Sequence, residues 1–246
     1  GMRDHLAGGF LRYSVDDRWL VPHFEKMLYD NGLLARAYVD AYRVTGLEDL
    51  RAVAEQTLEY LTNDMQAPGG GFYAARDADS EGEEGIFYVW TLQELESALG
   101  SDEARLFARV YDVSDGGNFE GRNILHLPHE LSSISRAEGI TQAQLEETLE
   151  CQRRILLDKR ARREPPFRDE KILVSWNSMA IRAFAEAGPT LNRWGFVDTA
   201  SKAALWIWAE LRPSGQLLRV LTDGIAKIPA FLEDYAALGN ALLSVH

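Results

Sequence analysis

Carboxylates gather in residues 69–90, GGGFYAARDADSEGEEGIFYVW, between two stretches of aromatic side chains. Asp77 and Asp79 stand two positions apart in this segment, shortly after Tyr73. In an extended strand both carboxylates would lie on one face, about 6.6 Å apart at 3.3 Å per residue. Glycoside hydrolases use two carboxyl groups, one protonated and one ionised, at a comparable separation. Asp77 and Asp79 are therefore candidate catalytic residues, and Tyr73 is a candidate substrate-binding residue.

Neighbouring carboxylates on one strand lie on the same side of a bound sugar, whereas a hydrolase pair flanks the bond that is cleaved. A second carboxylate from another part of the chain would solve this problem, and Asp30, Glu233 and Asp234 are the candidates. Crowded carboxylates raise one another's pKa, which a general acid requires. We interpret the later carboxylates of the segment as the solvated tip of a hairpin: Glu81, Glu83 and Glu84.

A calcium loop is the alternative for the same segment. The letters DADSEG place Asp77, Asp79 and Glu81 at positions 1, 3 and 5 of an EF-hand loop, with Gly82 at position 6. Position 12 is Tyr88, where the EF-hand needs a bidentate glutamate, and the flanking residues favour strands over helices. We assign no metal ligand, and a calcium-dependent structural role stays open.

A second group of candidates lies in residues 12–31, RYSVDDRWLVPHFEKMLYDN. The segment has little periodicity, and irregular backbone rich in aromatic and charged side chains commonly lines a pocket. His23 is a candidate general base, and the alternative is a purely structural hydrogen bond. Asp30 joins it as a candidate catalytic residue. The candidate substrate-binding residues are Arg12, Tyr13 and Trp19.

A third group lies at two predicted helix starts further along the chain. It consists of Trp176, Asn177, Asp234 and Tyr235. Aromatic faces stack on sugar rings, and amide or carboxylate groups match pairs of hydroxyls. We therefore take Asp234 as a candidate catalytic residue and the other three as candidate substrate-binding residues. Helix capping by Asn177 and core packing by Trp176 are the alternative, and capping is compatible with binding.

Composition restricts the classes of function. The chain has 246 residues, of which 46% are apolar, and this is enough for a substantial core. The net charge of −12 repels phosphate backbones and anionic lipids, so we expect neither nucleic-acid nor membrane binding. The single cysteine, Cys151, excludes an intramolecular disulfide and a zinc site built from cysteines of this chain. No stretch reaches eighteen apolar residues, and we expect a cytoplasmic protein without a cofactor.

Apolar periodicity predicts helices that would position these residues. The predicted helices span residues 29–42, 47–66, 141–162, 172–187 and 195–211, with a last one from 231. Asp30 or Asn31 is placed to cap the first helix, and Thr91 with Glu94 forms a capping box further on. Residues 222–224 favour a turn between two strands, and residues 86–90 favour a strand or core. No low-complexity linker divides the chain, so residues 1–246 are interpreted as one domain.

A weak internal repeat relates three of the helix starts. The segments KMLYDNGLLARAY, KILVSWNSMAIRAF and PAFLEDYAALGNAL share apolar residues, then a polar or aromatic pair, then a helix. Helix pairs of this kind bury their apolar faces only by stacking, as a solenoid or as a closed ring. In a ring the repeated helix starts would converge on one mouth, where a pocket can form.

Several long segments resemble, in order, the motifs of the spermatogenesis-associated protein 20 family. They are DHLAGGFLRYSVDDRWLVPHFEKMLYDNGLLARAY, GGGFYAARDADSEGEEGIFYVWT, GNFEGRNIL and DEKILVSWNSMAIRAFAEAG. The resemblance implies a mainly α, (α/α)6 six-hairpin glycosidase-like toroid with short β-hairpin insertions. Family members also carry a thioredoxin-like domain, which these residues do not include. The resemblance covers only part of the toroid, so we expect a partial ring.

The resemblance implies a fold shared with glycoside hydrolases and N-acylglucosamine 2-epimerases, but it supplies no reaction. The leading hypothesis is a carbohydrate-active or carbohydrate-binding toroid, with hydrolase-like or epimerase-like chemistry on a small sugar. The second is a non-catalytic interaction scaffold, because an open ring edge exposes apolar residues that favour self-association or a protein partner.

Overall fold

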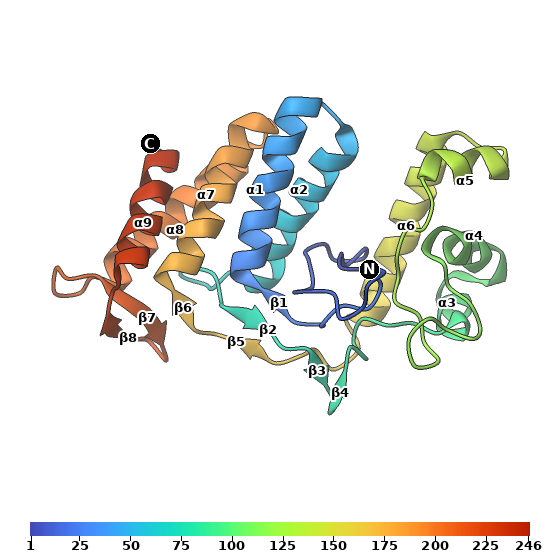
Figure 1. The fold of residues 1–246 in the computed structure, drawn as a ribbon, viewed down its shortest axis with the longest axis horizontal. Helices are drawn as coiled ribbons and strands as arrows, with labels where there is room; N and C mark the ends of the chain where they lie inside the picture. The colour runs from blue at the N-terminus through green and yellow to red at the C-terminus, as the bar shows by residue number, and fades with distance from the viewer. The chain divides into compact units, whose positions relative to one another are not determined.

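The computed structural model describes residues 1–246, which form nine α-helices, one π-helical turn and eight short strands (Figure 1). The predicted fold class, mainly α with short β-hairpin insertions, is confirmed. The chain packs as two compact units. Unit 1 comprises residues 1–7, 11–24 and 78–167, and unit 2 comprises residues 8–10, 25–77 and 168–246. Each is described by itself, and the single domain expected from the sequence stays a prediction.

Unit 2 contains five α-helices, four of which form two antiparallel pairs. They are α1 (Leu28–Thr45), α2 (Glu48–Tyr60), α7 (Val174–Thr190), α8 (Trp194–Glu210) and α9 (Leu232–Val245). Only two residues join α1 to α2 and only three join α7 to α8, so each pair is a hairpin. Helix α7 packs against α1, α8 and α9, and α1 packs against α2. This stacking of helical hairpins is the arrangement expected for part of an (α/α)6 toroid.

Small residues allow α1 and α7 to approach closely. A Cβ atom at Gly32 would lie 3.0 Å from the backbone nitrogen of Ala180, so a larger residue has no room there. The core between the helices is dry, with Leu28, Val39 and Phe184 fully buried. Burial of these apolar faces stabilises helices that would be marginal alone.

A three-stranded antiparallel sheet lies at the start of α1. Its strands are β1 (Lys26–Met27), β2 (Ala75–Arg76) and β5 (Arg168–Asp169), in the order β1-β2-β5. The π-helical turn Leu61–Met65 ends α2, and the chain then passes through three glycines before β2. A Cβ atom at Gly71 would lie 2.5 Å from the Trp206 ring, so glycine is required for this chain segment to cross α8.

A second antiparallel sheet precedes α9. Its order is β6 (Ile172–Leu173), β7 (Leu218–Thr222) and β8 (Ile225–Pro229). Asp223 and Gly224 join β7 to β8 with φ values of 52° and 73°. Two left-handed residues form the type I′ turn that suits the twist of a hairpin. The turn predicted at residues 222–224 is therefore confirmed.

Unit 1 contains the other four α-helices. They are α3 (Leu92–Leu99), α4 (Ser101–Tyr111), α5 (Leu131–Glu138) and α6 (Gln142–Arg160). Thr91 accepts a hydrogen bond from the Glu94 backbone at 3.1 Å, and the Glu94 carboxylate accepts from the Thr91 backbone at 2.8 Å. The predicted capping box is therefore confirmed. No helix in either unit has both the length and the apolar character that a bilayer span requires.

Residues 86–90, predicted as a strand or core, form a turn that leads into the core. The Val89 N–H donates to the Gly85 carbonyl at 3.2 Å, and Val89 and Trp90 are buried. One guanidinium group, that of Arg163, donates to three carbonyl groups of this segment, at residues 86, 87 and 89. These acceptors are therefore satisfied without a neighbouring strand. Of the two alternatives predicted for residues 86–90, a strand or core, the structure therefore shows the core.

Candidate functional site

Residues 12–23 of unit 1 form a two-stranded ribbon. The Val15 N–H donates to the Val21 carbonyl, and the His23 N–H donates to the Tyr13 carbonyl, both at 2.8 Å. These cross-ribbon bonds give the segment regular pairing that its sequence does not show. They also bring the two ends of the ribbon, Tyr13 and His23, to the same place.

Asp16 holds the turn of this ribbon. Its carboxylate accepts the N–H groups of Leu20 and Val21 at 2.9 and 3.0 Å, and the Ser14 hydroxyl at 2.8 Å. Desolvation acts to raise the pKa of Asp16, but the Ser14 and backbone hydrogen bonds outweigh it and hold this pKa below its usual value. The carboxylate therefore stays ionised and keeps the turn closed well into the acidic range.

His23 lies at the centre of a side-chain cluster. Its Nδ1 atom is 2.7 Å from Oε1 of Glu84, and its ring stacks on Tyr13 with centroids 5.0 Å apart. The Arg12 guanidinium lies 5.7 Å from the centre of the Tyr13 ring. Three candidates from the sequence, Arg12, Tyr13 and His23, are thus brought together. They are joined by Glu84, which the sequence analysis had assigned to a solvated tip.

Glu84 belongs to the acidic hairpin. Strand β3 (Asp79–Ser80) pairs with β4 (Glu83–Glu84), and Asp79 lies directly opposite Glu84. Residues that face each other across an antiparallel pair have their side chains on one face, with Cβ atoms about 4.5–5.5 Å apart. Asp79 is therefore the neighbour of the carboxylate that holds His23, and both carboxylates are exposed.

The turn of this hairpin excludes the EF-hand geometry. Glu81 and Gly82 have φ values of 53° and 82°, so they form a two-residue turn with paired strands on both sides. An EF-hand loop instead runs between two helices and wraps its ligands around the ion. The residues of the structure also contain no group of three or more side chains placed to hold a metal.

The His23–Glu84 contact fixes the chemistry of the ring. In the neutral imidazole only one nitrogen carries a proton, and a carboxylate at Nδ1 selects the Nδ1–H form. The lone pair that accepts a proton is then on Nε2. A carboxylate that orients an imidazole base is a common arrangement in active sites.

Trp19 occupies the tip of the ribbon. Its side chain is 69% exposed, and its φ of 59° is unusual for a bulky residue. Left-handed backbone at a non-glycine residue costs on the order of 1–3 kcal/mol and is enriched at ligand sites. Trp19 is therefore exposed at the tip of the ribbon, and its role as a substrate-binding residue stays a prediction.

In unit 2, Asn177 is buried and its amide is engaged by the backbone. Its oxygen accepts the Phe72 N–H at 2.6 Å, and its nitrogen donates to the carbonyls of Phe72 and Leu173 at 2.9 and 3.0 Å. The side chain has no exposed surface. The prediction that Asn177 contacts a substrate is corrected, because its amide is used to join the start of α7 to a neighbouring extended segment.

Asn31 repeats this arrangement at the start of α1. Its oxygen accepts the Phe10 N–H at 2.7 Å, and its nitrogen donates to the carbonyls of Phe10 and Met27 at 3.1 and 2.9 Å. The residue that precedes the helix is Met27, so neither Asp30 nor Asn31 occupies the capping position expected from the sequence. We call these two arrangements the asparagine clamps.

Trp176 and Asp30 lie in the first turns of α7 and α1 and are half-buried. The Trp176 ring packs edge-on against Tyr29, with centroids 4.8 Å apart. This contact joins the two helix starts through aromatic side chains. It places Trp176 partly in the packing role that the sequence analysis gave as its alternative.

Asp234 is buried and structural. Its Oδ2 atom accepts the Phe231 N–H and the Arg219 guanidinium, both at 2.9 Å. Its side chain is 0% exposed, so the catalytic role expected from the sequence is corrected. Tyr235, one position further along α9, is 50% exposed, and its role as a substrate-binding residue stays a prediction.

Tyr73 and Asp77 flank strand β2. The Arg168 guanidinium lies 4.4 Å from the centre of the Tyr73 ring, and Asp77 is exposed just after the strand. Next to them, Arg76 binds Asp64 with contacts of 2.6 and 2.9 Å. Desolvation acts to raise the pKa of Asp64, but Arg76 outweighs it and holds this pKa below its usual value.

The candidates from the sequence thus divide between the units. Strand β3 begins at Asp79 and Asp77 lies outside any strand, so the two do not share one strand face as expected. Unit 1 holds a cluster of titratable and aromatic groups around His23. Glu84, the central partner of His23, was not among the predicted site residues, because it was expected at the solvated tip of a hairpin.

No family model matches the chain. It is 32% identical to spermatogenesis-associated protein 20 of Homo sapiens, over all of this chain and 36% of that protein. The same protein of Rattus norvegicus gives 32% identity, with 100% and 36% covered. An uncharacterized protein of Caenorhabditis elegans gives 32% identity, with 100% and 38% covered. The chain therefore spans little more than a third of the length of these curated relatives.

Solved structures of sugar enzymes show a weak likeness. Cellobiose 2-epimerase from Spirochaeta thermophila is 14% identical, with 99% of this chain and 59% of that chain covered and a TM-score of 0.31. D-mannose isomerase is 14% identical, with 88% and 50% covered and a TM-score of 0.29. At these scores the likeness does not bear on the reaction of this chain. Over its whole length, the chain matches one part of the larger spermatogenesis-associated protein 20 family.

Proposed function

We propose that the ribbon and the acidic hairpin of unit 1 form a carbohydrate site in which His23 transfers a proton. The observation that carries the proposal is the 2.7 Å contact between Nδ1 of His23 and Glu84. This contact leaves the proton-accepting lone pair on Nε2 in the neutral ring. A base with an orienting carboxylate suits acid–base chemistry, whereas the contact is not needed to complete a buried core, since Glu84 is 46% exposed.

Aromatic and cationic groups beside His23 support a sugar as the substrate. Tyr13 is 49% exposed and stacks on the histidine, and Trp19 is exposed on the same ribbon. Flat aromatic faces pack against the C–H groups of a sugar ring. The Arg12 guanidinium, 5.7 Å from the centre of the Tyr13 ring, adds a positive charge beside these aromatic faces.

Epimerase-like chemistry fits this cluster better than glycoside hydrolysis. Asp79 and Glu84 lie on one face of one hairpin, whereas the hydrolytic pair has to flank the bond on two sides. A histidine base instead removes the proton from the carbon next to the carbonyl of an open-chain sugar. The C–H electron pair moves toward the carbonyl oxygen and gives an enolate. A proton delivered by water to the opposite face of that carbon inverts it, and His23 releases the proton that it removed to solvent.

Two readouts test binding and proton transfer separately. A thermal-shift panel of mono- and disaccharides reports binding, because a ligand at a hundred times its dissociation constant adds about 2.7 kcal/mol of stability. Incubation of the same sugars in D2O, followed by NMR, reports deuterium incorporation at the carbon next to the carbonyl. We expect Tyr13→Ala to lose the thermal shift, and His23→Gln to keep most of the shift but lose the exchange.

Glu83→Gln is the matched control for Glu84→Gln. Both residues are exposed glutamates of β4, but Glu83 faces Ser80 across the hairpin and not Asp79. We expect Glu84→Gln to slow deuterium exchange and Glu83→Gln to leave it unchanged. A folded protein with neither a sugar-dependent shift nor exchange, across the whole panel, would overturn the proposal.

Exposed apolar side chains support the interaction scaffold as a second candidate, with self-association as the contact. Leu205 on α8 is 71% exposed, and Leu232 and Leu243 on α9 are 85% and 78% exposed. Clusters of large exposed apolar residues are typical of protein interfaces. Sedimentation velocity over a hundredfold concentration range tests this candidate. Concentration-dependent dimers that Leu243→Glu abolishes would support it, and a monomer throughout would exclude self-association.

A further inference from the structure

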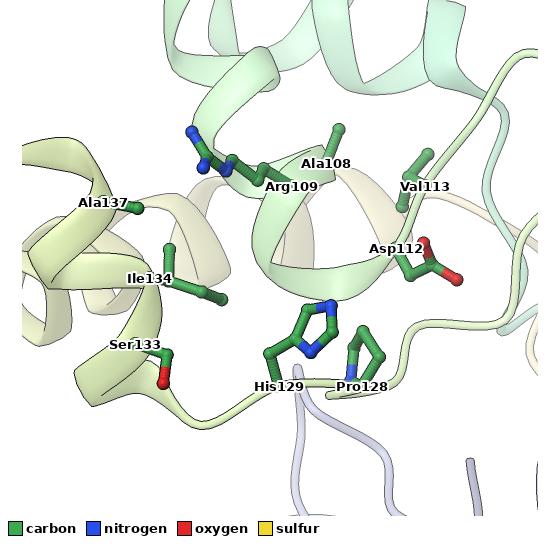
Figure 2. Close-up of a pocket in the computed structure, with 9 residues that line it drawn as sticks. All are labelled: Ala108, Arg109, Asp112, Val113, Pro128, His129, Ser133, Ile134 and Ala137. Carbon is green, nitrogen blue, oxygen red and sulfur yellow. The ribbon is translucent and has the colours of Figure 1, made fainter.

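A groove in unit 1 lies between α4, α5 and the loop before α5. Its volume is about 460 Å³, which falls within the range of small-molecule sites. Figure 2 shows the His129 ring between the last turn of α4 and the first turn of α5. The His23 cluster contributes no residue to the groove lining. The groove is therefore a candidate second site, separate from the proposed sugar site.

The inner wall of the groove is apolar. Ala108 and Val113 come from α4 and the residues after it, and Ile134 comes from α5, and all three are buried. Pro128 and Ala137 extend this apolar lining to the rim. An apolar body of a few carbon atoms would be desolvated against this wall, at about 25 cal/mol per Å² of area removed from water.

The charged groups of the lining are paired with residues outside it. Arg109 binds Glu138, and Asp112 lies 3.4 Å from the His126 ring. The carboxylate of Asp112 is thus engaged on the side away from the groove centre, where Figure 2 shows it pointing off from His129. Asp112, the single acidic group of the lining, therefore already has a histidine as its neighbour.

His129 and Ser133 differ from these charged groups because neither side chain has a hydrogen bond or ion pair within the protein. Both are exposed at the groove, and both can donate a hydrogen bond. Helix α5 begins between them with no side-chain cap, so the positive end of its dipole faces the same region. Two uncommitted donors and a helix start favour an acceptor group with negative charge.

We propose that this groove binds a small carboxylic acid, with its carboxylate at His129 and Ser133 and its apolar body against Val113 and Ile134. A neutral amide of the same shape is a weaker ligand, because it brings no charge to the start of α5. A longer-chain acid binds more tightly than a short one until the apolar wall is covered. The two donors select the carboxylate of the ligand, and the apolar wall selects its hydrocarbon part.

Heteronuclear NMR of the intact chain, titrated with butyrate, benzoate and benzamide, tests the proposal. We expect benzoate to shift the amide signals of residues 129, 133 and 134, and benzamide to bind at least tenfold more weakly. The double variant His129→Ala/Ser133→Ala should weaken benzoate by at least tenfold. Ala137→Trp should block binding by filling the groove, because Ala137 is exposed and lines it.

Ser132→Ala is the matched control. Ser132 neighbours Ser133 but its hydroxyl donates to Glu130, and it does not line the groove. Unchanged benzoate affinity in this variant, together with loss in the double variant, supports the proposal. Equal binding of benzoate and benzamide would overturn it, as would benzoate shifts elsewhere in the chain or none at 10 mM, a concentration on the order of weak fragment affinities.

Discussion

The two units differ in how they are held together. Unit 2 repeats one local device: the asparagine clamps of Asn31 and Asn177 join two helix starts to extended segments by three hydrogen bonds each. Unit 1 has no such repeat at its helix starts, although Asn123 makes the same kind of bonds to Ser114 and Trp90. Both units have ion pairs between distant segments, such as Arg36 with Glu186 in unit 2, but the pair in unit 1 is more deeply buried. The buried pair of Asp4 and Arg160 spans 156 positions of the chain.

The units also differ in where titratable chemistry is placed. Four of the five histidines, at positions 5, 23, 126 and 129, belong to unit 1, whereas unit 2 contains only His246. A repeated helical framework keeps its polar groups in fixed backbone bonds, and this leaves few of them for a ligand. The irregular unit is therefore where we place both proposed sites.

The largest effect is expected from Asp4→Ala in unit 1. Asp4 accepts two hydrogen bonds from Arg160, at 3.0 and 2.8 Å, and both residues are buried. Removal of one partner of a buried ion pair costs about 3 to 5 kcal/mol. Asp102→Ala, which breaks an exposed pair in the same unit, should cost less than about 0.5 kcal/mol.

Fluorine NMR of 5-fluorotryptophan protein in urea separates the units in this measurement. Trp90 reports on the core of unit 1 and Trp206 on unit 2. We expect the Trp90 transition to move to much lower urea in Asp4→Ala. A shift of the same size for Asp102→Ala would show that burial of the Asp4 pair does not determine how much stability is lost when one partner is removed.

A slightly smaller effect is expected from Asn177→Ala in unit 2. The change removes three hydrogen bonds and leaves the buried backbone groups of Phe72 without their partner, at a cost of about 3 kcal/mol. Asn31→Ala should give a similar loss, because its contacts are the same in kind. Asn240→Ala, an exposed asparagine of α9, is the control and should change little.

The same urea transitions test whether the clamps of Asn31 and Asn177 contribute equally to stability. If Asn31→Ala and Asn177→Ala both lower the Trp206 transition by similar amounts, the clamps are equivalent devices. If only one variant does, the two helix starts resemble each other in sequence, but their clamps do not contribute equally to stability.

The helices and turns were predictable because their signals are local. The apolar period of 3.6 gave the helices of unit 2, and the Asp223-Gly224 pair gave its hairpin. The polar pairs at the repeated helix starts were also found. Their role was not, because the partners of Asn31 and Asn177 are backbone groups 21 and 105 positions away.

The candidate site was predictable only in part, for the same reason. Arg12, Tyr13 and His23 share a short segment, so their proximity could be expected. Glu84 lies 61 positions from His23, and no local pattern links an exposed hairpin glutamate to that ring. Asp234 was misjudged because a carboxylate at a helix start looks the same in sequence whether it is exposed or buried against an arginine.

A pH-dependent effect of intermediate size is expected from His5 of unit 1. Burial, with added repulsion from Arg3, lowers the pKa of His5 from 6.5 to about 3. The unfolded chain therefore binds more protons than the folded one between these values. The contribution of neutral His5 to the free energy of unfolding is therefore complete above pH 6.5. As the pH falls from 6.5 toward 3, the free energy of unfolding decreases by at most about 1.4 kcal/mol per pH unit.

His5→Phe is the variant that isolates this effect, because a phenyl ring keeps the contact with Tyr111 but cannot take a proton. Between pH 7 and 5 the Trp90 transition should fall in the wild type and fall less in His5→Phe. His129→Phe, at an exposed position, should follow the wild type. The Trp206 transition should change less over this range, since Arg76 holds the pKa of Asp64 in unit 2 below its usual value despite desolvation. Equal slopes in both units would contradict the placement of titratable chemistry in unit 1.

The smallest effect is expected from Thr91→Ala, which tests whether unit 1 depends on local devices at all. Thr91 and Glu94 exchange two hydrogen bonds at the start of α3, and loss of such a cap costs about 1 kcal/mol. Glu94 also binds Arg163 at 3.1 Å, so the capping box is connected to the guanidinium that satisfies the turn at residues 86–90. A loss well above 1 kcal/mol at Trp90 would mean that the cap also positions Glu94 for this long-range contact. A loss of unfolding free energy near 1 kcal/mol that Thr91→Ser restores would mean that the cap acts only locally. The ion pairs of unit 1 would then form without it.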